Sequence, residues 1–173
     1  MASPPAVFPE SLQHLNEVYD ISAPLGRSPA FPGDRPYFQE WLEGTDGQKG
    51  YSLSSLSMSS HAGTHLDFPS HILLPGQSQN SYPLGRFIIP AEVISIYGSG
   101  PIMPSSLECC RAAQGQALLF KTENSRRKLM LEPTFNPDYV SLSPEAAGYC
   151  VSRGIGLVGI DYLSLDRYED ESL

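Results

Sequence analysis

Cysteine, histidine and positive charge are scarce in this sequence. Of 173 residues, three are cysteine and four are histidine, and 11 basic residues face 19 acidic ones. An odd number of cysteines, with Cys109 beside Cys110, excludes a framework of paired disulfides and indicates a reducing compartment with buried thiols. The formal net charge of −8 argues against a nucleic-acid partner, because phosphate binding needs clustered Lys and Arg.

Long apolar segments are also missing. No stretch approaches the roughly 20 apolar residues of a membrane span, and the N-terminus lacks the pattern of a signal peptide. We therefore expect no membrane partner and a cytoplasmic location. The composition, 40% hydrophobic and 17% charged, is that of a globular protein, and 16 prolines with 15 glycines favour short elements joined by turns.

The chain divides into a Pro-rich arm over residues 1–15 and a single domain over residues 16–173. β-Branched and apolar runs predict strands over 18–22, 51–58, 87–97, 117–121 and 155–161, the last buried on both faces. Residues 87–97 could form one or two strands, broken at Pro90. Capping signals predict helices from Ser105 to about Gln114 and from Ser143 to about Arg153. Residues 29–36 hold three prolines and predict an ordered loop. The order of elements predicts an α/β fold with a strand–helix–strand unit at its C-terminal end.

Three of the four histidines lie within residues 60–71, the segment SHAGTHLDFPSH. His61, His65, Asp67 and His71 are separated by even numbers, so their side chains share one face of an extended chain. In a straight strand His61 and His65 would be ~13 Å apart, too far to chelate one ion, whereas His65 and Asp67 would be ~7 Å apart. The chain must therefore bend at Ala62-Gly63, where glycine permits positive φ.

Two imidazoles and one carboxylate predict a metal site formed by His61, His65 and Asp67. Such a set leaves coordination positions for water or substrate, which is typical of catalytic metals. Zn²⁺ is the first expectation, and Mn²⁺ or Fe²⁺ is the alternative. Metal-bound hydroxide would be the nucleophile, and His71 could transfer the proton. The competing interpretation, hydrogen-bonded structural residues, is less favoured because the spacing is so regular.

Aromatic residues near this segment are candidates for a substrate-binding wall. Phe31 and Trp41 belong to the Pro-rich region, and Phe68 lies within the histidine segment itself. Small-molecule pockets are lined by such side chains around a few polar groups. The alternative is ordinary loop packing, and composition alone favours it.

Residues 61–71 match the pattern His-x-Gly-Thr-His-x-Asp-x-Pro-x-His at every defined position. In this the sequence resembles the cyclase family, which includes bacterial kynurenine formamidase and isatin hydrolase. Supporting matches are Tyr19-Asp20-Ile21-Ser22, Pro32-Gly33-Asp34, and residues 119–122 and 159–166. The resemblance extends from about residue 16 onward. It implies a swivelling β/β/α fold with a mixed sheet and a few short helices, assembled as a homodimer or homotetramer.

The resemblance also implies a function. It points to a metal-dependent hydrolase of a small amide, lactam or N-formyl bond, as in tryptophan catabolism, with a small-molecule substrate. His61, His65 and Asp67 resemble the family's metal ligands, and His71 resembles its acid/base. Family members continue past the Gly-Ile-Asp turn with a His and a Glu that complete the metal site.

This sequence has no histidine after His71, so we expect a domain shortened at its C-terminus. Two alternative functions stay open. One is a non-catalytic member that lacks half of the metal site. The other is a lyase or cyclase acting on a polyketide-like substrate.

Overall fold

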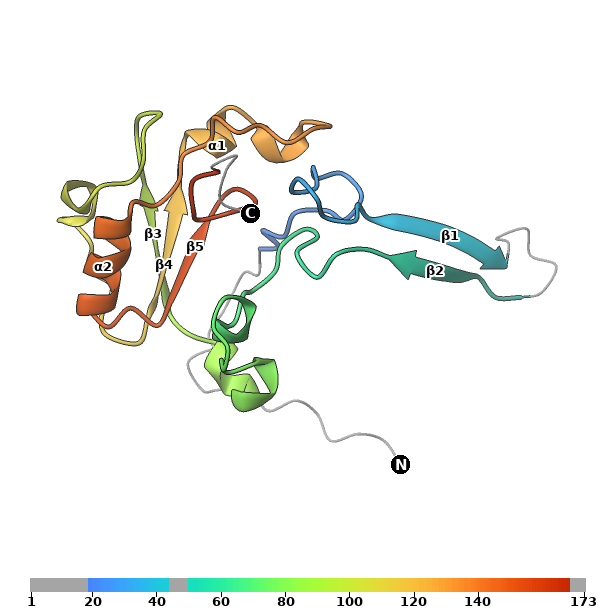
Figure 1. Cartoon of the computed structure of the whole chain (residues 1–173), viewed down its shortest axis with the longest axis horizontal. Coiled ribbons are helices and arrows are strands. Elements are labelled where there is room, and N and C mark those ends of the chain that lie inside the picture. The colour runs from blue at the N-terminus through green and yellow to red at the C-terminus, as the bar shows by residue number, and fades with distance from the viewer. Residues whose placement is uncertain (1–18, 44–49, 169–173) are drawn as a thin grey trace.

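The computed structural model describes residues 19–43 and 50–168, and its strands form two separate sheets (Figure 1). An antiparallel hairpin pairs β1 (Phe38–Glu43) with β2 (Leu53–Ser57). A parallel sheet has the order β3 (Ala91–Ser95), β4 (Ala117–Lys121), β5 (Leu157–Ile160). The helices are all short: α1 (Glu123–Arg126), α2 (Pro144–Ser152) and the 3₁₀ turns η2 (Pro69–His71), η3 (Gln79–Ser81), η4 (Leu84–Phe87), η5 (Pro104–Leu107) and η6 (Leu129–Leu131). The predicted α/β class is confirmed.

The main core lies between the parallel sheet and α2. Leu118 and Phe120 of the central strand β4 are buried, and they belong to one apolar cluster with Ala146 and Cys150 of α2. Strand β4 has a hydrogen-bonded neighbour on each side, which explains why it is the most buried strand. The expected burial of thiols holds for Cys110 and Cys150, whereas Cys109 is exposed and all three are free.

Helix α2 begins and ends where the sequence predicts. The Ser143 hydroxyl accepts a hydrogen bond from the Ala146 amide at 3.1 Å, and Pro144 occupies the first turn. This satisfies an amide that the helix itself leaves unpaired. At the other end Gly154 has a φ of +65°, a left-handed conformation that favours glycine and stops the helix.

Two element predictions need correction here. Residues 19–22 form no strand, because the Ser22 amide donates to Asp20 Oδ1 at 2.9 Å in a local turn. The expected helix from Ser105 to Gln114 is reduced to η5. Beyond it, the backbone amides of 111 and 112 donate to the Glu92 carboxylate on β3, which takes the chain off a helical path.

The hairpin is the element that the sequence prediction missed in part. The strand predicted over 51–58 agrees with β2, but the sequence predicted no strand over residues 38–43, where Trp41 pairs with Ser54 in the ladder. The hairpin extends away from the parallel sheet (Figure 1), and both strands are largely exposed. Strand β3 begins after Pro90, where the sequence predicted a break. Strand β5 is half-buried rather than fully buried because it is the last strand of the described sheet.

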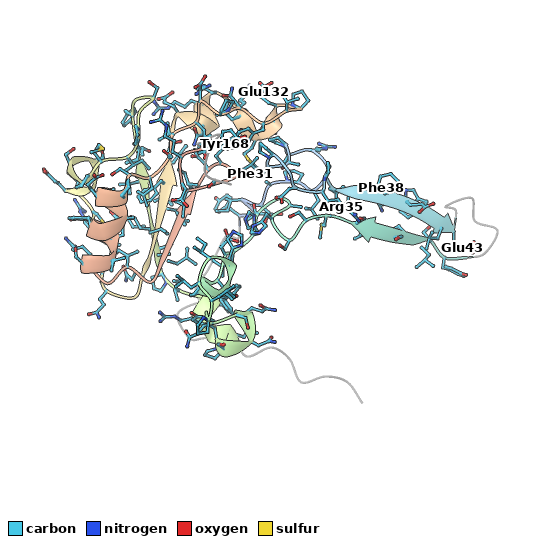
Figure 2. All side chains as sticks on the ribbon, in the orientation of Figure 1. Phe31, Arg35, Phe38, Glu43, Glu132 and Tyr168 are labelled. Carbon is cyan, nitrogen blue, oxygen red and sulfur yellow. The ribbon has the colours of Figure 1, made fainter. Side chains whose placement is uncertain are left out.

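An aromatic cluster joins the Pro-rich loop to the C-terminal part of the described chain. The ring of Phe31 lies 5.3 Å from that of Phe135 and 5.8 Å from that of Tyr168. Figure 2 shows Phe31 and Tyr168 beside each other between the hairpin and the parallel sheet. Tyr139 and Tyr162 extend the cluster through Phe135. Contacts of this kind fix the loop that lies against the histidine segment.

No helix among the described residues is both long enough and apolar enough to cross a membrane. The predicted arm over 1–15 and the last five residues of the sequence lie outside the described residues.

Candidate metal centre

The histidine segment follows directly from β2 and folds as a tight turn. The Ala62 amide donates to the Ser59 carbonyl at 3.2 Å, and Gly63 has a φ of +65°. A Cβ built on Gly63 would lie 2.9 Å from Leu25 Cδ2, so both conformation and space favour glycine here. The predicted bend at Ala62-Gly63 is confirmed.

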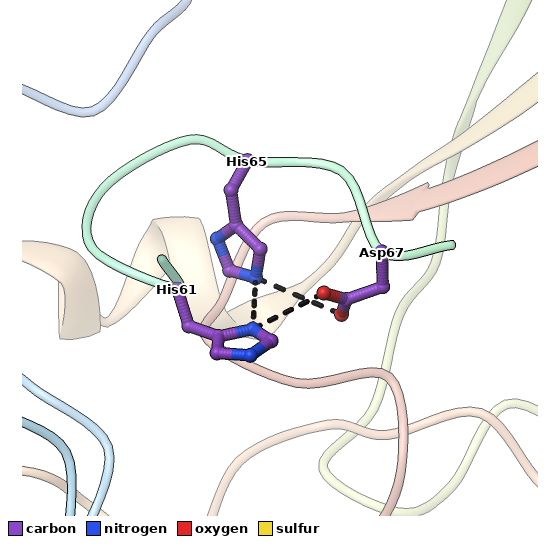
Figure 3. Close-up of side chains that lie close together, drawn as sticks. All are labelled: His61, His65 and Asp67. Atoms are coloured by element: carbon purple, nitrogen blue, oxygen red, sulfur yellow. Dashed lines mark hydrogen bonds and ion pairs between the residues drawn. The ribbon is translucent and has the colours of Figure 1, made fainter. Parts of the chain in front are cut away.

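The turn brings three predicted ligands together (Figure 3). His61 Nδ1 lies 3.2 Å from His65 Nε2 and 3.1 Å from Asp67 Oδ1. His65 Nε2 lies 3.7 Å from Asp67 Oδ2. The two imidazoles are partly buried, with 24% and 18% of their side chains exposed, and the carboxylate is 50% exposed. One side of the group is therefore open to solvent.

A hydrogen bond to the backbone selects the tautomer of His65. Its Nδ1 lies 3.0 Å from the Gly63 carbonyl oxygen, and a carbonyl oxygen can only accept. Nδ1 must therefore carry the proton, which leaves the lone pair on Nε2, the atom that faces His61 and Asp67. Metal-ligating histidines are commonly oriented in this way by a second hydrogen bond.

The spacing of donor atoms on the three residues is near that of a site for one small cation. Ligand bonds of about 2.0–2.2 Å in a tetrahedral zinc site require donor atoms about 3.3–3.6 Å apart. His61 Nδ1 lies near this distance from His65 Nε2, at 3.2 Å, and from Asp67 Oδ1, at 3.1 Å. One ligand atom from each of the three residues lies within 4.8 Å of the other two. Nitrogen with carboxylate oxygen also suits Mn²⁺. His61, His65 and Asp67 could therefore hold a metal ion with positions left for other ligands.

His71 lies next to this group without joining it. Its ring centre is 4.4 Å from that of His61. It ends the 3₁₀ turn η2, in which its amide donates to the Phe68 carbonyl at 2.8 Å. The side chain is exposed. It is thus placed to exchange a proton with a molecule bound at the metal group.

The three aromatic candidates are in different surroundings. Phe31 lines a small pocket to which His61, Tyr37 and Arg35 also contribute. Trp41 does not line it and lies on the hairpin with 58% of its surface exposed. Phe68 packs against Tyr82 and Phe87, with ring centres 5.5 and 5.9 Å away. The structure brings only Phe31 to a pocket that a predicted ligand also lines.

Contacts from residues 23–25 to the turn were not foreseen from the sequence. The Thr64 hydroxyl accepts a hydrogen bond from the Ala23 amide at 2.8 Å, and Leu25 packs over Gly63. The two segments are about forty positions apart in the chain. Contacts between distant segments leave no periodic pattern in the sequence. The signal that could have indicated them is that the motif specifies both Gly63 and Thr64.

Comparison with known proteins identifies the family. The family model described as "Putative cyclase" matches residues 19–167. This chain belongs to the cyclase family. Kynurenine formamidase of Paracidovorax citrulli (strain AAC00-1) is 35% identical over 162 residues, which cover 90% of this chain and 73% of the relative. Kynurenine formamidase of Bordetella pertussis (strain Tohama I) is 30% identical over 161 residues, covering 92% and 75%.

Two solved structures share the fold of this chain. One, described as a potential metal-dependent hydrolase with cyclase activity, has a TM-score of 0.70 and 26% identity, and covers 89% of this chain and 72% of that one. A second, described as a predicted metal-dependent hydrolase from Bacillus stearothermophilus, has a TM-score of 0.70 at 24% identity and covers 90% of this chain and 74% of that one, which bears on the fold alone. The expected cyclase-like fold and the hydrolase class are confirmed.

Proposed function

We propose that this protein is a metal-dependent hydrolase of a small amide, lactam or N-formyl bond. The observation that carries the proposal is the convergence of one ligand atom each from His61, His65 and Asp67 within 4.8 Å of one another. The kynurenine formamidase relatives suggest N-formylkynurenine as the first substrate to test. The resemblance of the motif to that of isatin hydrolase suggests the lactam isatin as the second.

The ligand set would hold Zn²⁺ or, alternatively, Mn²⁺. When bound, such an ion lowers the pKa of a coordinated water and polarises a carbonyl oxygen. The carboxylate of Asp67 neutralises part of its charge, and the Gly63 carbonyl fixes the His65 ring through the 3.0 Å contact with Nδ1. The partly buried imidazoles reduce the access of bulk water from one side.

His71 is the residue that we assign to proton transfer. Its ring lies against that of His61 while remaining exposed, so the imidazole can reach a substrate on the open side of the ligand set. In hydrolysis of an amide the leaving nitrogen must gain a proton, and imidazole is the side chain that most often supplies one in general acid catalysis. Loss of such a group costs about 10²–10⁴ in rate.

A pair of matched variants tests these roles separately. The metal-free protein would be assayed on N-formylkynurenine and isatin, with and without added Zn²⁺ or Mn²⁺. We expect His65→Asn to lose both metal binding and turnover, and His71→Asn to keep metal binding while turnover falls at least about a hundredfold. Turnover that is independent of added metal, or unchanged in His65→Asn, would contradict the proposal. Absence of turnover with metal bound would reject both substrates.

A further inference from the structure

Thr64 lies between the two histidine ligands, and its hydroxyl is bonded to a distant part of the chain. The Ala23 amide donates to Thr64 Oγ1 at 2.8 Å. Thr64 is itself exposed and Ala23 is half-buried. The contact therefore reaches from the surface of the turn to the segment that enters the Pro-rich loop.

The neighbouring residue of the turn is held by the same segment. A Cβ built on Gly63 would lie 2.9 Å from Leu25 Cδ2 and 3.3 Å from the Ala23 carbonyl oxygen. Residues 23–25 thus lie directly against Gly63 and bond to Thr64. We call residues 23–25 the strap.

The strap contacts two of the three residues that separate His61 from His65. One of them, Gly63, also provides the carbonyl oxygen that fixes the His65 ring through Nδ1. A change in the peptide between Gly63 and Thr64 would therefore move the imidazole as well as the backbone. The 3.2 Å separation of His61 Nδ1 and His65 Nε2 depends on this peptide.

We propose that Thr64 is a positioning residue for the candidate metal centre, acting through its hydrogen bond to the strap. This rests on the proposed function for the metal, but the positioning itself concerns the chain alone. Supporting hydrogen bonds around metal ligands are worth about 10–100-fold in metal affinity. We expect an effect of that size from the loss of the Thr64 hydroxyl.

Three variants isolate the hydroxyl. Thr64→Val keeps the shape of the side chain and removes the acceptor, whereas Thr64→Ser keeps the acceptor. Thr134→Val makes the same chemical change on another exposed threonine, which lines a pocket with Phe135 and Asn136, and serves as the control. Zn²⁺ affinity would be measured by competition with a chelating dye, and the Tm of each metal-free variant would be measured in parallel.

We expect Thr64→Val to bind Zn²⁺ at least about tenfold more weakly, with Thr64→Ser and Thr134→Val close to the parent protein. Equal Zn²⁺ affinity in Thr64→Val and Thr134→Val would overturn the proposal. The proposal would also be overturned if Thr64→Ser bound Zn²⁺ as weakly as Thr64→Val. It would be overturned, too, if Thr64→Val bound Zn²⁺ weakly only because its metal-free form is partly unfolded.

A second measurement separates this proposal from the proposed function. Long-range ¹H–¹⁵N spectra of the metal-free protein report which ring nitrogen of His65 carries the proton. We expect the Nδ1–H form in the parent protein and in Thr64→Ser, and a mixture of tautomers in Thr64→Val. A parent protein that shows these spectra but binds neither Zn²⁺ nor Mn²⁺ would contradict the proposed function and leave the positioning role standing. Identical His65 spectra in all variants would overturn the positioning role.

Discussion

The Glu92 carboxylate on β3 explains why the chain after η5 does not continue as a helix. Its Oε2 accepts hydrogen bonds from the amides of Arg111 and Ala112 at 2.7 and 2.6 Å, and the Cys110 thiol lies 3.6 Å away. Burial alone would raise the pKa of this carboxyl, but the donated hydrogen bonds outweigh it and hold the pKa below the ordinary value of 4.5. The charged form is therefore favoured in the folded protein.

This shift predicts a pH dependence of stability for Glu92→Gln. A carboxyl with a lowered pKa in the folded state stabilises the protein above about pH 4.5, and the stabilisation is lost as the pH falls through the folded-state pKa. We expect Glu92→Gln to lower the Tm at pH 7, and the difference from the parent protein to shrink below pH 4.5. Thermal unfolding between pH 7 and pH 3 measures it. The exposed Glu108→Gln is the control, and a Tm difference that persists unchanged at pH 3 would contradict the argument.

The convergence of the histidines was predictable at the residue scale because their spacing is a local property. Even spacing predicted one shared face, and the impossible ~13 Å gap between His61 and His65 in a strand predicted the bend that Gly63 provides. The surroundings of Trp41 and Phe31 were not predictable, because each depends on a partner far along the chain. Trp41 pairs with β2, and Phe31 contacts Phe135.

At the scale of elements, two serines with similar sequence signals behave differently. Both Ser105 and Ser143 were expected to cap helices, but only Ser143 accepts an amide hydrogen bond in its first turn. The difference comes from tertiary contacts. Helix α2 packs on the sheet through Ala146 and Cys150, whereas the backbone amides that follow η5 donate hydrogen bonds to Glu92. Strand and helix signals predicted β2, β4 and α2, whose contacts agree with their local preferences.

The difference between the serines is measurable. Replacement of an N-cap serine by alanine costs about 1 kcal/mol, so Ser143→Ala should lower the free energy of unfolding by that amount. Ser105→Ala should leave it nearly unchanged, because the η5 turn has no side-chain cap. Urea unfolding followed by circular dichroism compares the two. Equal losses in both variants would show that Ser105 also caps its turn.

The turn that presents His71 is closed by a glycine with no room for a side chain. A Cβ on Gly76 would lie 2.5 Å from the Leu73 carbonyl oxygen and 2.7 Å from Ser70 Cα. We expect Gly76→Ala to lower the free energy of unfolding by about 1–3 kcal/mol, because the backbone beside η2 must move. Gly100→Ala, where nothing lies within 4 Å of the added atom, is the matched control. A loss no larger in Gly76→Ala than in this control would contradict the expected crowding.

At the scale of the whole molecule, the parallel sheet is stabilised by a buried apolar core, whereas both strands of the hairpin are largely exposed. A two-stranded hairpin is marginal on its own, and here it presents exposed apolar side chains, among them Phe38, Trp41 and Leu56. The parallel sheet instead packs against α2 through a buried apolar cluster.

The homodimer or homotetramer expected from the sequence stays a prediction. Sedimentation of the purified chain would measure its oligomeric state.

Binding of a metal ion by His61, His65 and Asp67 should raise the free energy of unfolding of the whole chain. A ligand that binds only the folded state at 100 times its Kd adds about 2.7 kcal/mol, which for a chain of this length raises the Tm by about 5–10 °C. We expect Zn²⁺ to produce this shift, a chelator to reverse it, and His65→Asn to abolish it. Scanning calorimetry of both proteins, with and without Zn²⁺, makes the comparison. An equal rise in His65→Asn would locate the ion elsewhere, for example at the exposed thiol of Cys109. His61, His65 and Asp67 all belong to a single turn. If Zn²⁺ raises the Tm of the parent protein but not that of His65→Asn, metal binding at this turn stabilises the whole chain.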